Sequence, residues 1–239
     1  MSNVVCIFVV SGLLATCSAV FAETRAAADH PDLSAVDHLV YAAPDLDSAV
    51  ARIERLLGVR ATAGGSHPGM GTRNALISLG PATYLEIIAP DPAQADYRRP
   101  RVFRIDELDA PRLVTWAAKS DDIDRLATTK LDGGARLGAA MAGSRETPDG
   151  SRLAWQLTDP YQVIADGVVP FFIDWGDTPH PAGSASSRAT LVELRAEHPD
   201  PERIRRMFAA LGLDVAVTEA AEPALSAIID SPRGRVELR

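Results

Sequence analysis

Residues 36–58, VDHLVYAAPDLDSAVARIERLLG, carry the pattern that decides the fold. The stretch opens with an apolar run, residues 36–43, that is rich in residues favouring β-strands. Pro44 and Asp45 end this run and begin a helix, in which apolar residues recur at three- and four-residue steps over residues 46–57. Gly58 then ends the helix. The stretch therefore predicts a strand followed by an amphipathic helix.

The residues after this helix complete a structural unit. A loop rich in glycine and proline is expected over residues 63–72, and two strands are expected over residues 75–79 and 83–89, separated by Gly80 and Pro81. The order of the unit is strand, helix, loop and strands.

The same order returns twice further along the chain. Each later unit also begins with a strand and a helix, and its helix covers one face of its strands while leaving the other bare. We therefore expect units to pair their bare faces into a cup. The second unit has strands at 113–118, 153–157 and 168–173 with a helix at 121–130, and the third has strands at 190–196, 224–229 and 235–238 with a helix at 201–211.

The composition is that of a soluble globular protein and excludes several classes of function. The chain has 239 residues, of which 46% are hydrophobic, 23% charged and 5% aromatic. Lys and Arg number 24 against 32 Asp and Glu, which gives a net charge of −8. Because this negative field repels phosphate backbones, we expect no nucleic-acid partner.

The N-terminus has the features of a secretory leader. Residues 1–22 contain no charged side chain and run from an apolar core to small residues at the −3 and −1 positions before a cut after Ala22. No Lys or Arg precedes the core, so an uncleaved anchor or a misassigned start codon stays open. Residues 23–34 form a polar linker. We expect a periplasmic or secreted protein, with no stable membrane insertion after the leader is removed.

Both cysteines, Cys6 and Cys17, fall inside this leader. The mature chain would therefore contain no thiol nucleophile, disulfide or zinc–thiolate site. Any metal ion would be held by His, Asp or Glu side chains, backbone carbonyls or water.

Several motifs resemble the glyoxalase-like branch of the vicinal oxygen chelate superfamily. They are DHLVY at 37–41, LGV at 57–59, HPGMGT at 67–72 with Asn74, YLEIIA at 84–89 and PFFIDWGDTPHP at 170–181. The resemblance spans about residues 35–239. It implies an α+β fold of repeated βαβββ modules, with a cup-shaped mixed sheet and helices outside. The modules would be residues 35–110, residues 111–182 and a partial third at 188–239, all in one globular unit.

The resemblance also implies a divalent metal ion, held by a His on the first strand and a Glu on the last. His38 and Glu86 match these positions. The ion would act as a Lewis acid on adjacent substrate oxygens, and Zn, Mn, Fe, Ni and Mg all remain open. Period-two alternation supports the pair, because His38 shares a strand face with Val40 and Ala42, and Glu86 shares one with Tyr84 and Ile88.

The second module departs from the family pattern. The positions that match His38 and Glu86 hold Thr115 and, near the last strand, Phe172, neither of which is a normal ligand. One explanation is that His180, or Asp174, supplies the missing ligand or acts as the base. The other pairs modules one and three, which would bring in Glu193 and Glu237. We favour the pairing of modules one and two, because neighbouring modules usually pair.

These observations lead to two functions and one structural alternative. The first is a divalent-metal-dependent lyase, isomerase or dioxygenase, with Glu86 or His180 as the base. The second is a metal-free protein that sequesters a small molecule in the same cup. The third is a degenerate or dimerising domain whose cup is filled by Trp116, Trp155 and Phe172, and a homodimer is left open in every case. The residues expected to contact a substrate are His67, Asn74, Tyr84, Trp116 and Trp175.

Overall fold

The computed structural model describes Met1, residues 32–147 and residues 150–239. The expected leader, most of the linker and both cysteines lie outside the described residues. Within the described part of the chain, no helix is long and apolar enough to cross a membrane.

The two first modules form a single eight-stranded sheet. Its order is β2-β3-β4-β1-β5-β8-β7-β6, and the central strands β1 (Val36–Ala42) and β5 (Arg112–Lys119) pair antiparallel. Modules one and two are therefore joined strand to strand, which is the pairing that the sequence favoured. The remaining strands of the sheet are β2 (Thr62–His67), β3 (Thr72–Gly80), β4 (Thr83–Pro90), β6 (Met141–Glu146), β7 (Arg152–Leu157) and β8 (Phe171–Asp174).

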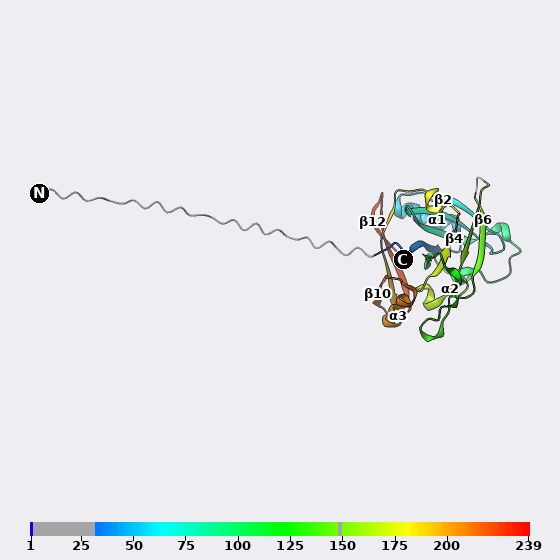
Figure 1. Ribbon diagram of the computed structural model, residues 1–239. Coiled ribbons are helices and arrows are strands. Elements are labelled where there is room, and N and C mark those ends of the chain that lie inside the picture. The colour runs from blue at the N-terminus through cyan, green and yellow to red at the C-terminus, as the bar shows by residue number, and fades with distance from the viewer. Residues whose placement is uncertain (2–31, 148–149) are drawn as a thin grey trace.

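The sheet curls until its two edge strands meet. Arg145 on β6 donates a hydrogen bond from Nη1 to the carbonyl oxygen of Gly64 on β2, with a distance of 2.5 Å. The result is the nearly closed cup seen in Figure 1. The predicted α+β fold with a cup-shaped sheet is thus confirmed.

The third module forms a separate sheet on the outside of the cup. Its order is β10-β9-β11-β12, and Figure 1 shows β10, β12 and α3 on one side of the molecule with β6 on the other. Phe208 of α3 meets Trp116 of β5 edge-on at 6.2 Å between ring centroids. The elements are β9 (Thr190–His198), α3 (Pro201–Leu211), β10 (Ala216–Glu219), β11 (Ala224–Ser231) and β12 (Gly234–Leu238).

This arrangement overturns the alternative pairing of modules one and three. Glu193 forms an ion pair with Arg195 at 2.6 Å, and Glu237 lies on an exposed part of β12. Neither carboxylate lines the cavity that contains His38.

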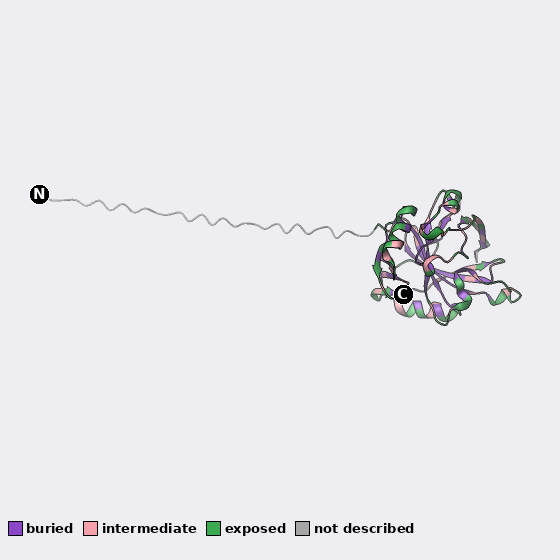
Figure 2. Ribbon diagram, turned by 90° about the horizontal axis from the view of Figure 1, so that it is seen from below, coloured by how far each residue is buried: buried purple, intermediate pink, exposed green. Residues whose placement is uncertain are grey.

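Helix α1 (Leu46–Leu57) forms as the sequence predicts. The carboxylate of Asp45 accepts a hydrogen bond from the backbone N–H of Ser48, and Gly58 ends the helix with a φ of 68°. The buried face of α1 covers one side of the sheet, where alternate β1 residues such as Leu39 and Tyr41 point. The intervening residues of β1 face the cup, and Figure 2 shows the buried interior between these layers.

Sequence reasoning missed three strands, namely β2, β6 and β10. Residues 63–72 were expected to be a loop, but their first half forms β2, despite Gly64 and Gly65, because it pairs with β3. Strands β6 and β10 were also not expected, since β6 has few apolar residues and β10 has only four residues. The second helix, expected over residues 121–130, is the shorter α2 (Ile123–Thr128).

Gly167 permits a close contact between the segment before β8 and strand β5. Its φ is +90°, and a Cβ atom at this position would lie 1.8 Å from the carbonyl oxygen of Val114. Gly234 has a similar φ of +94°, but a Cβ there would meet nothing within 4 Å.

We expect Gly167→Ala to destabilise the protein more than Gly234→Ala does. Both substitutions carry the cost of a left-handed backbone, about 1–2 kcal/mol, but only the first adds a backbone clash. Urea denaturation of the two variants measures the difference. Equal losses of unfolding free energy would contradict the close packing of this segment on β5.

Candidate functional site

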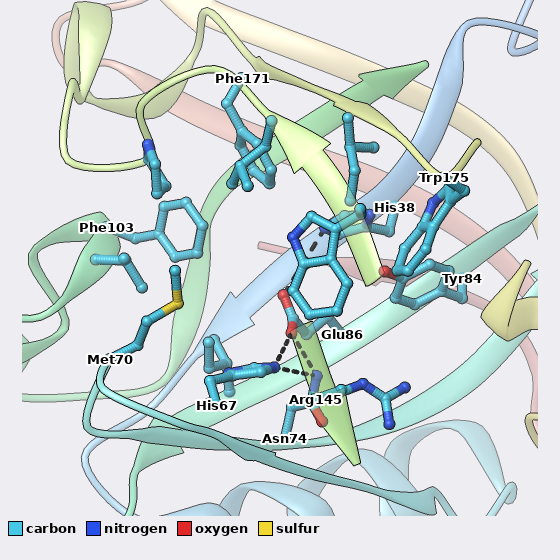
Figure 3. Close-up of a pocket in the computed structure, with 16 residues that line it drawn as sticks. His38, His67, Met70, Asn74, Tyr84, Glu86, Phe103, Arg145, Phe171 and Trp175 are labelled. Atoms are coloured by element: carbon cyan, nitrogen blue, oxygen red, sulfur yellow. Dashed lines mark hydrogen bonds and ion pairs between the residues drawn. The ribbon is translucent and has the colours of Figure 1, made fainter. Parts of the chain in front are cut away.

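A cavity of about 500 Å³, counting its open mouth, lies inside the cup. Figure 3 shows that module one supplies most of its polar side chains and that aromatic rings stand opposite them. The lining residues are His38, His67, Met70, Asn74, Tyr84, Glu86, Ile88, Val102, Phe103, Arg145, Trp155, Leu157, Pro160, Phe171, Ile173 and Trp175.

The Glu86 carboxylate lies between two imidazole rings. Its Oε2 atom is 3.8 Å from Nε2 of His38, and its Oε1 atom is 3.9 Å from Nε2 of His67. Asn74 donates a hydrogen bond of 2.6 Å from Nδ2 to Oε1. Strand register explains the grouping, because β4 pairs with β1 on one side and with β3 on the other. The carboxylate is 7% exposed and therefore largely shielded from water.

The ring of His38 is held in one orientation by its neighbours. Its Nδ1 atom lies 2.7 Å from Oδ1 of Asp37, and its ring stacks on Tyr84 with centroids 4.5 Å apart. With Nδ1 donating to the carboxylate, the neutral ring presents the lone pair of Nε2 to the cavity. That lone pair and the Glu86 carboxylate face each other, so a proton or a cation between them would be stabilised.

The Asp37 carboxylate receives hydrogen bonds from three side chains. Besides His38, Nε1 of Trp175 donates to it at 3.2 and 3.3 Å, and Nε2 of His180 lies 3.2 Å from Oδ2. Nδ1 of His180 accepts the N–H of Ala182, which leaves the proton of the neutral ring on Nε2. Burial alone would raise the pKa of Asp37, but the hydrogen bonds and charges of His180 and His38 hold that pKa well below its ordinary value.

His67 and Asn74 form the other side of the Glu86 environment. Nε2 of His67 lies 3.2 Å from Nδ2 of Asn74, and Nδ1 lies 2.9 Å from Oγ1 of Thr72. Burial lowers the pKa of His67, so the ring is neutral near pH 7 and accepts the second amide proton of Asn74 at Nε2. Burial also raises the pKa of Tyr84 well above its ordinary value, with the charges of Asp37 and Glu86 adding to the effect. The Tyr84 phenol is therefore neutral.

Module two contributes an apolar wall to the cavity in place of the expected second pair of ligands. His38 pairs across the sheet with Ala117, and Thr115 lies opposite Val40, two residues further along β1. On β8, Phe171 faces the cavity, whereas Phe172 belongs to the core on the other face. Neither strand therefore presents a metal-binding group beside His38.

The described residues therefore offer only two donors, His38 and Glu86, for a divalent ion. Among residues 32–147 and 150–239, no three His, Cys, Asp or Glu side chains are grouped as a metal site would require. His38 Nε2 and Glu86 Oε2 fit one ion as a pair, because metal–ligand bonds of about 2.0–2.2 Å span their separation. The link from Asp37 to the far ring nitrogen of His38 is the support that ligating histidines usually have.

Three sequence-based site predictions are corrected by the structure. Trp116, expected to contact substrate, is fully buried in the outer core, where its Nε1 donates to the carbonyl oxygen of Val168. His180, expected as a ligand or base, does not line the cavity and uses its ring nitrogens for Asp37 and Ala182. Asp174 likewise lies outside the cavity lining. The other predicted residues, His38, His67, Asn74, Tyr84, Glu86 and Trp175, all line the cavity.

Arg145 is the charged residue of the cavity lining that sequence reasoning missed. It lies on β6, a strand that the sequence pattern did not indicate, and its side chain is only 4% exposed. A single arginine in a segment without apolar alternation carries no sequence signal of a site. Only the closure of the cup brings it to the Glu86 cavity.

Comparisons with known proteins identify the family. The family model for the glyoxalase-like domain matches residues 36–212. A hypothetical protein from Staphylococcus aureus has a similar structure, with a TM-score of 0.59, 14% identity, and coverage of 83% of this chain and 92% of that one. Methylmalonyl-CoA epimerase from Mycobacterium tuberculosis matches with a TM-score of 0.38, 21% identity, and coverage of 60% and 89%. No curated protein matches the chain.

The Asp37 carboxylate makes stability depend on pH in a defined direction. Its folded-state pKa lies below the ordinary value of 3.8, so its contribution to stability is present above about pH 4 and is lost as the pH falls below it. We expect Asp37→Asn to lower the free energy of unfolding by about 1.5–3 kcal/mol at pH 7. Urea denaturation from pH 7 to pH 3 should show this difference shrinking in acid.

The exposed carboxylate of Asp47 provides the control for this comparison. We expect Asp47→Asn to change the unfolding free energy by no more than about 0.5 kcal/mol at either pH. A loss for Asp37→Asn that stays constant down to pH 3 would show that the charge of Asp37 is not what stabilises the fold.

Proposed function

Because the chain belongs to the glyoxalase-like domain family, we propose that it is an enzyme acting on a small substrate with adjacent oxygens. The proposed reaction is of the lyase or isomerase type, in which a proton leaves a carbon next to those oxygens. The observation that carries the proposal is the Glu86 carboxylate in a largely apolar cavity, with an imidazole nitrogen on each side.

Glu86 is assigned as the proton acceptor. Its Oε1 atom is held by Asn74, whereas Oε2 faces Nε2 of His38 at 3.8 Å, a distance longer than a hydrogen bond. Oε2 is therefore available to take a proton from a bound substrate. His38 offers a second basic atom beside it, so the proton can be shared between the carboxylate and the imidazole.

A divalent ion is also part of the proposal: His38 Nε2 and Glu86 Oε2 would hold it, and Oε2 would serve as the proton acceptor only while it does not ligate the ion. When bound, such an ion supplies Lewis-acid polarisation of the substrate oxygens. Because module two offers no donor, the other coordination positions would be left to substrate oxygens and water. Asp37 would hold the His38 ring in the orientation that ligation needs.

The remaining lining supports binding of a small organic molecule. The neutral phenol of Tyr84 can donate a hydrogen bond, and it stacks on the catalytic imidazole. Phe103 and Phe171, with ring centroids 5.2 Å apart, form an apolar surface opposite the polar groups. Such a surface excludes water, which strengthens the electrostatic interactions at Glu86.

A metal-free binding protein is the second candidate function. The specific observation in its favour is that the residues of β5 and β8 on the cup side beside His38 are Ala117 and Phe171, neither of which can ligate a metal ion. In that case the cup would sequester an apolar small molecule, and Glu86 and His38 would orient it through hydrogen bonds.

Metal titration separates the two functions. We expect the purified protein to bind about one divalent ion per chain, and His38→Ala and Glu86→Gln each to weaken binding at least about tenfold. Isothermal titration with Zn²⁺, Mn²⁺, Fe²⁺, Ni²⁺ and Mg²⁺ measures this. His198→Ala, on the separate third-module sheet, should leave the affinity unchanged. Absence of binding, or full affinity in His38→Ala, would favour the metal-free protein.

Exchange of a substrate's carbon-bound hydrogen with solvent tests the proposed chemistry even though the natural substrate is not identified. We expect the protein to catalyse exchange of the carbon-bound hydrogen of 2-oxo acids or hydroxyketones in D₂O, followed by NMR. Glu86→Gln should slow this exchange by about 10²–10⁴-fold, the usual contribution of a positioned base. Glu193→Gln, outside the cavity, should retain the wild-type rate. A Glu86→Gln variant as fast as wild type would remove Glu86 from the mechanism.

A further inference from the structure

Arg145 places a buried positive charge in the cavity for which the described residues supply no counter-ion. The side chain is 4% exposed and lines the same cavity as Glu86, as Figure 3 draws it. Within the described part of the chain, its side chain donates one hydrogen bond, from Nη1 to the Gly64 carbonyl oxygen. Among residues 32–147 and 150–239, no carboxylate forms an ion pair with it.

This situation is energetically unfavourable for an arginine. A guanidinium has five N–H donors, and burying it without an anionic partner costs several kcal/mol. Burial lowers the pKa of Arg145, while the negative charge of Glu86 acts in the opposite direction. An anion entering the cavity would remove the cost.

Two glycines allow close backbone approach where β2 meets β6, the strand that carries Arg145. A Cβ atom on Gly65 would lie 2.4 Å from the carbonyl oxygen of Glu146 and 3.6 Å from Nη1 of Arg145. A Cβ atom on Gly64 would lie 2.0 Å from Oδ1 of Asn74. A side chain at position 65 would therefore push β6 away from β2, and one at position 64 would displace Asn74. Gly65 thus lets the strand that carries Arg145 lie close against β2.

We propose that Arg145 binds the carboxylate of the substrate. The inference rests on the proposed function, because it takes the Glu86 cavity as the place where substrate binds. A guanidinium pairs with a carboxylate through two parallel hydrogen bonds, which fixes orientation as well as charge.

The apolar side chains of the cavity limit which carboxylic acids would fit. Phe103, Phe171 and Leu157 form an apolar surface suited to an aliphatic or aromatic group. A substrate with two adjacent oxygens, one of them on a carboxylate, is a 2-oxo or 2-hydroxy acid. The structure therefore assigns a small 2-oxo or 2-hydroxy acid with an apolar side chain as the substrate class.

The test compares acids with their neutral esters in binding experiments on the full chain. Phenylpyruvate and 4-methyl-2-oxopentanoate, each alongside its methyl ester, are titrated calorimetrically without added metal. We expect at least one acid to bind at least about tenfold more tightly than its ester, as a charge-assisted pair requires. Arg145→Met, which keeps the apolar stem, should lose this preference, whereas Arg145→Lys should keep part of it.

Two further variants complete the design. Arg152→Met removes an exposed arginine on the neighbouring strand β7 and should preserve the preference for the acid. Glu86→Gln should still bind the acid while losing hydrogen exchange, so failure of the proposed enzyme and failure of the carboxylate site are seen separately. Thermal unfolding confirms that each variant is folded. If Arg145→Met does not fold, the partial loss of acid preference in Arg145→Lys is the result compared with the wild type.

The proposal is overturned by any of three results. They are an ester bound as tightly as its acid by the wild type, a full acid preference in folded Arg145→Met, and no binding of either acid.

Discussion

The buried Asp37 carboxylate is the constraint on which the arrangement of the site depends. A charge with 1% exposure needs hydrogen-bond donors, and it finds them on its own strand in His38 and on the loop after β8 in Trp175 and His180. This single carboxylate therefore orients the imidazole that faces Glu86 and links the second module to the first. The side chain of Trp175, held in this way, becomes part of the cavity wall.

The two halves of the cup have the same topology but opposite chemistry. Module one places His38, His67 and Glu86 on neighbouring strands, so their charges and lone pairs converge. The equivalent strands of module two place Phe171 and Trp155 there instead. This division makes one wall of the cavity polar and the other apolar, which is the usual character of a site for a small organic molecule. Arg145 is the exception on the second half, and its charge lies in the cavity with that of Glu86.

Elements with strong local signals were predicted well. The first helix has a cap at each end and an apolar face, and β1 and β4 are apolar runs rich in strand-forming residues, so residues 36–58 and 83–89 needed no tertiary information. Strands β2 and β6 could not be found in this way, because Gly64, Gly65 and the polar β6 residues have little strand propensity and are held by pairing alone. Trp116 was misplaced because its face depends on the pairing of β5 with β1: it lies opposite Leu39 and joins the same core cluster, away from the cup.

The sequence by itself indicated the repeated units and the cup, because these follow from hydrophobic periodicity and local capping, and the family resemblance singled out His38 and Glu86. Only the tertiary structure decided which modules pair, that His180 bonds to Asp37, and that Arg145 reaches the cavity. Those outcomes depend on contacts between residues 81 to 143 positions apart in the chain, whose geometry is set by sheet register and curvature. Local residue patterns do not encode that geometry.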